Sequence, residues 1–242
     1  MLSIEPRSIR KTNGSGFYLS CKKGFLLIIT ERTKCQVKDL GCIDYRKAYD
    51  LQKKYVDGVL NNEPQTLLLC EHSPVLTLGR LADEDHMLCS HEEMKKNDVD
   101  VWHIDRGGDI TLHAPGQLVV YPILGLENFG KDLRSYLRQL EQVAIDLLNR
   151  FDIVANRFPG QTGVWAGDKK IVSIGIGVRK WVSFHGLAVN INTDLDLFSM
   201  IKPCGLDVTM TSMSQVKGVE ISMLEVKTVI VDCFKKNFDL II

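Results

Sequence analysis

The chain has 242 residues, of which 45% are hydrophobic and 25% are charged, so it holds enough apolar material for a domain with a sizeable core. Thirty basic residues balance thirty acidic ones, and no overall charge favours nucleic acid or an anionic membrane as a partner. The seven cysteines are scattered and form no CxxC pair, which favours a reducing compartment and a cytoplasmic location.

The first 34 residues differ in composition from the rest of the chain. They carry seven Lys or Arg and two acids, Glu5 and Glu31. The composition is typical of a basic extension, and it also suits a transit peptide, which would direct the protein to a mitochondrion or another organelle. The apolar run 24–30 is shorter than the roughly 20 residues that span a bilayer. We therefore predict a basic extension over 1–34, one folded domain over 35–242, and no membrane span.

The first half of that domain predicts a helix and several short strands. Apolar residues at helical spacing behind Asp44, a suitable N-cap, predict a helix that ends at Leu60. Ser90 and Glu93 form a capping-box pattern, which marks the start of a short helix. Around these helices, aliphatic and β-branched runs predict strands over 66–70, 75–79 and 99–104.

The second half predicts hairpins between two long helices. A buried strand over 118–123 precedes a helix that Asp132 caps and that reaches Leu148, and Ser222 with Glu225 opens the final helix. Short turns at 167–168 and 179–180 separate three β-rich runs and predict two successive hairpins over 163–166, 170–178 and 182–191. Hairpins mixed with helices predict an α+β fold with a mainly antiparallel, mixed sheet flanked by helices.

The segment 106–117 is predicted to be a loop, and it concentrates residues that are able to bind a ligand. Its glycines allow positive φ and close approach of backbone N–H groups, while Pro115 stiffens the chain before the next strand. A tight turn with a hydrogen-bonded His113 is the alternative. The chain contains neither GxGxxG nor GxxxxGK[ST], so the usual fingerprints give no support for nucleotide phosphate binding.

Cys204 is the candidate nucleophile, since it lies between Pro203 and Gly205 in a sequence that favours an exposed turn. An inert buried thiol is the common alternative. A thiol pKa near 8.5 leaves little thiolate at neutral pH, and lowering it by about 1.5 units takes about 2 kcal/mol from a cationic or basic neighbour. The sequence leaves five candidates for that neighbour: Lys169, Lys170, Lys202, His113 and His185.

Two histidine-containing segments remain ambiguous. His86, Cys89 and His91 have the spacing of metal ligands, but the chain offers no second pair for a structural zinc site, so we predict a polar surface loop and no metal. His72 precedes Ser73-Pro74 and is either a turn residue or part of a pocket wall.

Taken together, these motifs resemble the lipoyl(octanoyl) transferase family over residues 35–238. The segments that carry the resemblance are 71–80, 106–117, 170–175, 185–190 and 203–205. The resemblance implies a fold like that of biotin and lipoate protein ligases, with 35–242 as an octanoyltransferase catalytic domain. The family usually has Gly where this chain has Ala114.

The resemblance also implies residue roles. Cys204 would carry the acyl thioester, and Lys170 would lower the pKa of that thiol. His113 and His185 would lie at the polar end of the acyl pocket, with His185 and His72 as polar support. The residues that would line the pocket are Arg106, Gly107, Gly108, Asp109, Ile110, Thr111, Leu112, His113, Ser173, Ile174, Gly175, Gly186, Leu187 and Ala188.

The implied reaction transfers an octanoyl or lipoyl group from acyl carrier protein to a lysine of a lipoyl domain, as the first step of endogenous lipoate synthesis. The acceptors would be 2-oxoacid dehydrogenase E2 subunits and the glycine cleavage H protein, and neither ATP nor a metal is required. Because acyl carrier protein is acidic, we expect a basic docking face drawn from Arg80, Lys169, Arg179, Lys180 and Lys202.

Three other functions fit parts of the sequence. An ATP-dependent lipoate or biotin ligase would need ATP, and a cysteine hydrolase using Cys204 with His113 or His185 would release free fatty acid. A silent binder of lipoyl domains or carrier protein would keep the fold without turnover, although the chain retains both Lys170 and Cys204.

Overall fold

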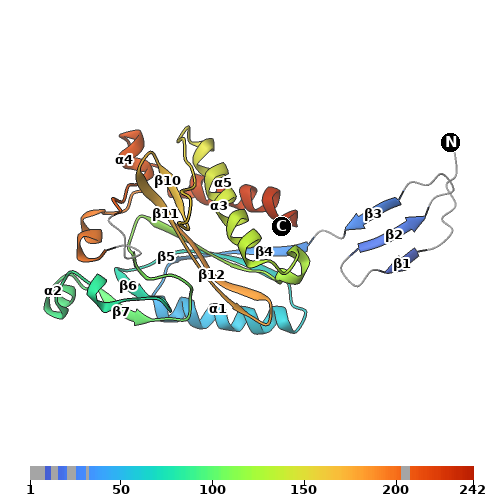
Figure 1. Ribbon diagram of the computed structural model, residues 1–242, viewed down its shortest axis with the longest axis horizontal. Helices are drawn as coiled ribbons and strands as arrows, with labels where there is room; N and C mark the ends of the chain where they lie inside the picture. Colours follow the sequence, from blue (N-terminus) through green and yellow to red (C-terminus); the bar gives the residue numbers. More distant parts are fainter. Residues whose placement is uncertain (1–8, 12–15, 21–25, 31–32, 203–207) are drawn as a thin grey trace.

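A curved seven-stranded sheet forms the centre of the computed structural model, which describes residues 9–11, 16–20, 26–30, 33–202 and 208–242 (Figure 1). Four of its pairings are antiparallel, whereas β4 pairs in parallel with β5 and β13, so the predicted mixed, mainly antiparallel sheet is confirmed. In spatial order the strands are β10 (Val164–Ala166), β11 (Lys169–Arg179), β12 (Val182–Asn190), β9 (Gln117–Ile123), β5 (Gln65–Glu71), β4 (Thr33–Cys42) and β13 (Leu240–Ile241).

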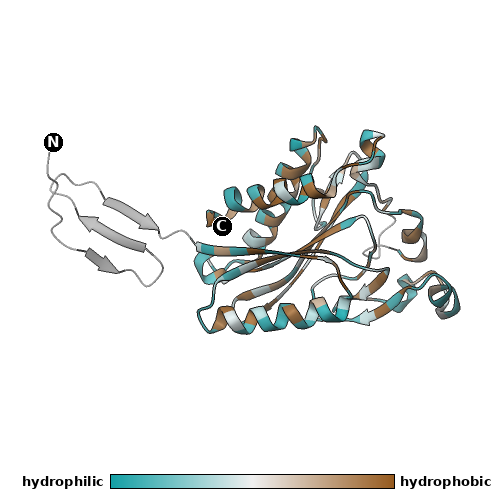
Figure 2. Cartoon of the chain, turned by 180° about the vertical axis from the view of Figure 1, so that it is seen from behind, coloured by the Kyte–Doolittle hydropathy of each residue, from teal (hydrophilic) through white to brown (hydrophobic). Residues whose placement is uncertain are grey.

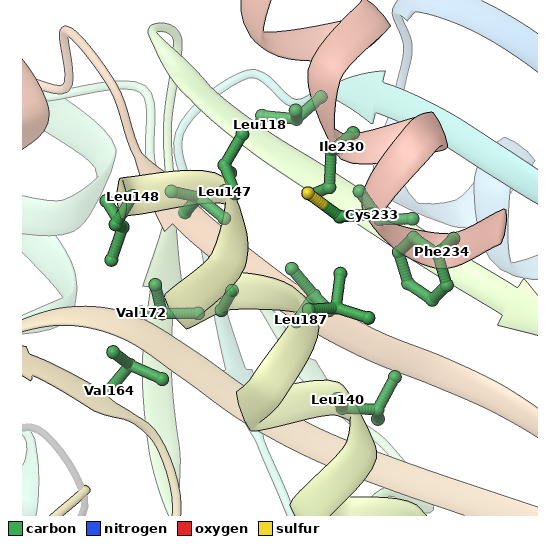
Figure 3. Close-up of a cluster of buried hydrophobic side chains, with 14 of the residues drawn as sticks. Leu118, Leu140, Leu147, Leu148, Val164, Val172, Leu187, Ile230, Cys233 and Phe234 are labelled. Carbon is green, nitrogen blue, oxygen red and sulfur yellow. The ribbon is translucent and has the colours of Figure 1, made fainter. Parts of the chain in front are cut away.

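Helices cover both faces of this sheet. Helices α3 (Leu133–Arg150) and α5 (Met223–Phe238) lie on one face, and α1 (Tyr45–Leu60) lies on the other (Figure 1). Hydrophilic and hydrophobic residues alternate along the helices, as expected for helices with one buried face (Figure 2). Leu147 of α3, Ile230 of α5 and Leu187 of β12 meet in the larger hydrophobic core (Figure 3). The result is an α+β fold, as predicted.

The predicted helix starts are confirmed by their caps. Asp44 accepts from the backbone N–H of Lys47 at 3.0 Å, and Asp132 accepts from those of Arg134 and Ser135. The capping box of Ser90 is present at α2 (His91–Lys96), and Ser222 caps α5. Local side-chain hydrogen bonds decide these positions, which is why sequence patterns identify them.

A second sheet contains a strand that the sequence interpretation missed. Its order is β7 (Asp100–His103), β6 (Val75–Leu78) and β8 (Ile110–His113), and β8 falls inside the segment that was predicted to be a loop. Ile110 and Leu112 are fully buried, and β8 pairs antiparallel with β6. The glycines and proline around 110–113 suggested a loop, but the alternating apolar residues between them form a paired strand.

The two predicted hairpins are present in the large sheet. The turn between β11 and β12 lies at Lys180 and Trp181, one residue later than predicted, and both residues have left-handed φ of 48° and 64°. Two consecutive positive φ values match a turn whose twist suits an antiparallel hairpin. β10 and β11 pair with a register shift, because Val164 faces Val172 whereas Trp165 faces Lys170.

The remaining described elements lie outside the central sheet. None of the helices in the described ranges is long and apolar enough to cross a membrane. A separate antiparallel sheet forms from described parts of the first 30 residues, and its strands are β1 (Ile9–Lys11), β2 (Gly16–Ser20) and β3 (Leu26–Thr30). The remaining short helices in the described ranges are η1 (Glu84–His86), η2 (Leu126–Phe129), η3 (Asp196–Met200) and α4 (Met213–Lys217).

Candidate active site

A pocket lies between the large sheet, the first turn of α1 and the chain around β8. Most of the predicted pocket residues line it: Arg106, Gly108, Asp109, Ile110, Thr111, His113, Ser173, Ile174, Gly175, His185, Gly186, Leu187 and Ala188. Gly107 and Leu112 do not. Gly107 instead donates its N–H to the carbonyl of Ile176 at 2.8 Å, and Leu112 is buried in the core of the small sheet.

Strand register explains why two separate segments form one wall. Ser173 faces Ala188, Ile174 faces Leu187, and Gly175 faces Gly186 on adjacent rungs of the β11–β12 pair. Three further residues line the pocket although the sequence motifs did not predict them: Tyr45, Val119 and Tyr121. Val119 and Tyr121 are two apart on β9, a spacing that puts both side chains on one face of the strand.

Arg106 joins the loop to the small sheet. Its guanidinium donates to the carbonyl of Thr77 at 2.6 Å, to the Thr77 hydroxyl at 3.0 Å and to the carbonyl of Gly107 at 3.1 Å. The side chain passes close to Gly175, where an added Cβ would lie 2.9 Å from Arg106 Cδ. Glycine at this position therefore leaves room for the arginine against the β11 wall.

A row of four near-parallel rings runs along the α1 side of the site. His113 stacks on Tyr45 at 6.2 Å between centroids, Tyr45 on Tyr49 at 6.5 Å, and Tyr49 on His185 at 5.6 Å. Tyr45 and Tyr49 are four residues apart and so share one face of α1. The row connects the two histidines that the sequence resemblance put at a single end of the pocket.

His72 is fully buried and lies behind the pocket lining. Its Nδ1 is 2.7 Å from the carbonyl of Ile43, which only accepts, so Nδ1 carries the proton. Its Nε2 then accepts from the hydroxyl of Tyr121 at 2.7 Å. Burial lowers the pKa of His72, and the neutral ring supports a tyrosine that lines the pocket.

A buried hydrogen-bond chain connects His113 to the backbone of Lys170. Asn190 Nδ2 donates to the carbonyl of Thr211 at 2.9 Å, and because a carbonyl only accepts, this bond fixes the orientation of the Asn190 amide. Asn190 Oδ1 then accepts from Gln117 Nε2 at 2.9 Å. At one end of the chain, the Gln117 side-chain oxygen Oε1 accepts from His113 Nδ1 at 2.7 Å. At the other end, Thr211 N–H donates to the Lys170 carbonyl at 2.9 Å. Desolvation lowers the pKa of His113 to about 3, so its ring is neutral at neutral pH.

Lys170 lies near the start of β11, and only 2% of the residue is exposed. The register shift leaves Ile171 opposite no residue of β10, and such bulges change the direction of neighbouring side chains. The ammonium of Lys170 lies 5.2 Å from the centroid of Trp165. Gly163 borders the same side chain, because a Cβ there would lie 2.7 Å from Lys170 Cε.

Gly163 is held by a buried carboxylate of α3. Glu141 Oε1 accepts from Gly163 N–H at 3.3 Å, while its Oε2 accepts from Arg138 at 2.7 Å and Arg157 at 2.9 Å. Two arginines thus neutralise a carboxylate that is 1% exposed. This ion-pair network supports the glycine that makes room for Lys170.

Cys204, the predicted nucleophile, lies outside the described residues. On one side of 203–207, Lys202 N–H donates to the carbonyl of His86 at 2.8 Å. On the other side, Lys170 N–H donates to the carbonyl of Thr209 at 2.9 Å, and Met210 forms a parallel bridge with Lys170. The chain that follows the predicted nucleophile thus runs beside the predicted catalytic lysine.

Three cysteines in the described part of the chain are poor nucleophiles. Burial raises the pKa of Cys35 to about 12 and that of Cys233 to about 11, and it raises the pKa of Cys70 further. The thiolate is the reactive form of cysteine, so these thiols are inert near neutral pH.

His185 lies far from Lys170 along the sheet. It faces Ile176, which is six residues from Lys170 along β11, or about 20 Å at about 3.4 Å per residue. His113 and His185 line the same pocket, and only His113 is also connected to the Lys170 backbone through the hydrogen bonds of Gln117, Asn190 and Thr211.

The structure also corrects the expected docking face. Lys169 begins β11 and Arg179 ends it, so they lie about 34 Å apart along the strand. Arg179 forms an ion pair with Asp57 of α1. Of the five predicted residues, Lys169 and Lys202 lie near the Lys170 end, whereas Arg179 and Lys180 belong to the far hairpin.

The segment 86–91, whose spacing suggested metal ligands, places His86 beside the carboxylate of Asp109. His86 Nδ1 lies 2.6 Å from a carboxylate oxygen of Asp109, and Cys89 is partly buried. Among the described residues, no group of three or more His, Cys, Asp or Glu side chains is arranged to hold a metal ion.

The chain shares its fold with solved ligase structures. The chain superimposes on lipoate-protein ligase A bound with ATP with a TM-score of 0.67 and 17% identity, covering 87% of each chain. It superimposes on the biotin protein ligase of Aquifex aeolicus with biotin and ATP with a TM-score of 0.52 and 15% identity, covering 84% of this chain and 70% of that one. At these identities the comparisons establish the fold, as the sequence resemblance implied.

Residues 44–235 match the family model of the lipoyl protein ligase A/B catalytic domain, so the chain belongs to that class of proteins. Two bacterial octanoyltransferases match nearly over their whole lengths. That of Pelobacter propionicus is 43% identical over 205 residues, covering 84% of this chain and 95% of the relative. That of Syntrophotalea carbinolica is 47% identical over 202 residues, covering 83% and 92%. Within the class, the chain belongs to the octanoyltransferases, which are acyltransferases.

A third relative is longer than this chain. The octanoyltransferase of Porphyromonas gingivalis is 43% identical over 220 residues, which cover 86% of this chain. The matched part is 45% of the length of that relative. The octanoyltransferase family assignment therefore concerns the domain that the three relatives share.

Proposed function

We propose that residues 35–242 transfer an octanoyl group from acyl carrier protein to a lysine of a lipoyl domain, through a thioester on Cys204. The acceptors would be 2-oxoacid dehydrogenase E2 subunits and the glycine cleavage H protein, in the first step of lipoate synthesis. The observation that carries this proposal is the position of Lys170. It is a buried lysine three residues before Ser173 of the pocket wall, and its backbone pairs with the chain that follows Cys204.

In the first half-reaction, the Cys204 thiolate attacks the carbonyl carbon of the carrier thioester. The tetrahedral intermediate collapses, the bond to the carrier sulfur breaks, and the acyl group remains on Cys204. The leaving thiolate takes a proton from the Lys170 ammonium. The acyl chain would lie along Ser173–Gly175 and Gly186–Ala188, whose rungs form the β11–β12 wall.

In the second half-reaction, the neutral amine of the acceptor lysine attacks the Cys204 thioester. Lys170, now neutral, accepts the proton that the amine loses, and Cys204 leaves as a thiolate, so the starting protonation is restored. His185 is unsuited to this role because it lies about 20 Å away along β11. His113 is a weak base because burial keeps its pKa near 3. The thioester is already activated, so the reaction draws on no ATP.

Intact-mass analysis after incubation with octanoyl carrier protein tests the mechanism. We expect one octanoyl adduct on the wild type, none on Cys204→Ala, and at least 100-fold slower formation on Lys170→Ala, because that variant lacks the proton donor. Lys169→Ala is the matched control at saturating carrier concentration, since Lys169 is the exposed neighbour of Lys170 and should change KM for the carrier but not the maximal rate. Adding the acceptor domain should discharge the adduct without ATP.

Two outcomes would contradict the proposal. An undiminished adduct on Cys204→Ala would show that another residue carries the acyl group. A requirement for ATP with free octanoate as substrate would instead indicate a ligase, and discharge to free octanoate in the presence of the acceptor would indicate a hydrolase.

The corrected docking face makes a separate prediction about the carrier. Charge reversal at Lys169 and Lys202, both exposed near Lys170, should raise KM for octanoyl carrier protein by about fivefold each at low salt, or about 1 kcal/mol. The effect should shrink as salt increases, because exposed charges are screened. Lys180→Glu is the control, since the far hairpin should not contact the carrier. Equal effects at Lys180 and Lys169 would contradict this docking position.

A further inference from the structure

The far end of the pocket is closed by the imidazole of His185. This residue lines the pocket beside Gly186, and its side chain is 3% exposed. Its strand partner Ile176 lies one rung beyond Gly175, on the side away from Lys170. A chain that enters from the Lys170 end and follows the β11–β12 wall therefore meets His185 last.

The His185 ring is held in place from several directions. Its Nε2 lies 3.0 Å from Asp105 Oδ1, and the same oxygen accepts from the Tyr49 hydroxyl at 2.9 Å. The Tyr49 ring also stacks on the imidazole with an interplanar angle of 10°. The backbone N–H of His185 donates to Gln52 Oε1 at 2.7 Å. Rotating the ring aside would break its hydrogen bond to Asp105 and remove its stacking contact with Tyr49.

The backbone of His185 is itself specialised. Its φ is +55°, in the left-handed region that few residues other than glycine and asparagine adopt readily. A strand residue in this conformation aims its side chain differently from its neighbours. Backbone strain of this kind persists where the surroundings hold it, here Gln52, Tyr49 and Asp105.

The ring presents no positive charge to the pocket at neutral pH. Burial lowers the pKa of His185, although Asp105 acts in the opposite direction. Hydrogen bonds from His185 and Tyr49 lower the pKa of Asp105 to about 2, so the carboxylate is ionised and accepts from a neutral imidazole. A neutral aromatic ring forms a wall against which an alkyl end can pack.

The length of the wall matches an eight-carbon chain. From the rung of Ser173 to that of Ile176 is three residues, or about 10 Å. An extended chain advances about 1.2 Å per bond, so seven carbon–carbon bonds span about 8 Å, and the terminal methyl group adds its own radius. An octanoyl group that starts near Ser173 ends at the His185 ring, whereas two further carbons would collide with it.

We infer that His185, held by Asp105 and Tyr49, is the residue that limits the length of the acyl chain. This inference rests on the proposed acyl transfer through Cys204 and adds to it the determinant of chain length. Arg106, which passes Gly175 and is bonded to Thr77, closes the neighbouring side of the same end.

The test compares carriers loaded with six-, eight-, ten- and twelve-carbon chains. For the wild type, kcat/KM for acyl-enzyme formation should be greatest with eight carbons. In His185→Gly and His185→Asn, which both tolerate a φ of +55°, the ratio of kcat/KM for ten carbons to that for eight should rise at least tenfold. Tyr49→Ala removes a support of the ring and should shift the ratio in the same direction by a smaller factor.

Lys180→Gly is the matched control, because Lys180 also has positive φ and lies on the same hairpin away from the pocket. Its chain-length ratio should equal that of the wild type. If all three pocket variants form the adduct with an unchanged ratio, His185 does not limit the chain. If the wild type forms no adduct on Cys204 with any carrier, the proposed acyl transfer fails instead, so the two failures are distinguishable.

Discussion

Replacing Gly163 with alanine should slow acyl-enzyme formation at least 100-fold. Gly163 has φ of +135°, which a residue with a Cβ rarely adopts, and the added methyl group would lie 2.7 Å from both Lys170 Cε and the carbonyl of Val172. The backbone of β11 cannot yield easily, so the lysine side chain must move. A displacement of about 1 Å at a catalytic group can cost about 100-fold in rate. A single-turnover time course with octanoyl carrier protein, followed by intact mass, measures the effect.

The control for this variant is Gly167→Ala in the adjacent turn. Gly167 also has a left-handed φ, +62°, but an added Cβ would have no neighbour within 4 Å. It should therefore lose some stability through backbone strain while keeping the rate of acyl-enzyme formation. Circular dichroism of both variants confirms that each is folded before the rates are compared. A Gly163→Ala protein that is folded and reacts at the wild-type rate would contradict the assigned role of this glycine.

The free energy of unfolding should fall steeply as the pH decreases from 7 to 5. In the folded chain, burial holds the pKa of His113 near 3, whereas an unfolded histidine titrates near 6.5. Below pH 6.5 the unfolded state binds a proton that the folded state does not, so acid favours unfolding. His113 alone should cost about 2 kcal/mol at pH 5, at about 1.4 kcal/mol per pH unit. His72, whose pKa burial also lowers, should add to the loss. Urea unfolding at several pH values measures the slope.

Single substitutions show whether the buried His113 or an exposed histidine causes the pH dependence of unfolding. His113→Asn should unfold with a shallower dependence on pH, even if its stability at pH 7 is lower. His103→Gln removes an exposed histidine of β7 and should keep the wild-type slope. Equal slopes for His113→Asn and the wild type would contradict the neutral, buried state of His113.

Much of the fold is predictable from local sequence patterns. Asp44, Asp132, Ser90 and Ser222 start helices because their side chains bond to backbone N–H groups within three residues. The hairpins of the central sheet follow from β-rich runs and turn residues, although the last turn lies one residue later than expected. β8 was missed because its four residues lie between glycines and a proline that suggest a loop.

Most of the candidate site was found as separate segments, but their arrangement was not. The motifs at 106–113, 173–175 and 186–188 each suggested a pocket wall, and strand register brings them together. Tyr45 and Tyr121 carried no signal, because a tyrosine on a helix or a buried strand usually belongs to the core. Nothing in the spacing of His113 and His185 indicated that the rings of Tyr45 and Tyr49 would connect them.

Residue type and spacing along the chain therefore determine the helices, the hairpins and the kinds of groups that surround Lys170, since these depend on short-range hydrogen bonding and burial patterns. Tertiary packing decides the distances among those groups. It pairs Thr209 and Thr211 with Lys170, leaves Gly163 as the space for the lysine side chain, and sets His185 about 20 Å away along β11. Contacts between residues far apart in the chain arise from strand register and core packing, which short sequence motifs do not encode.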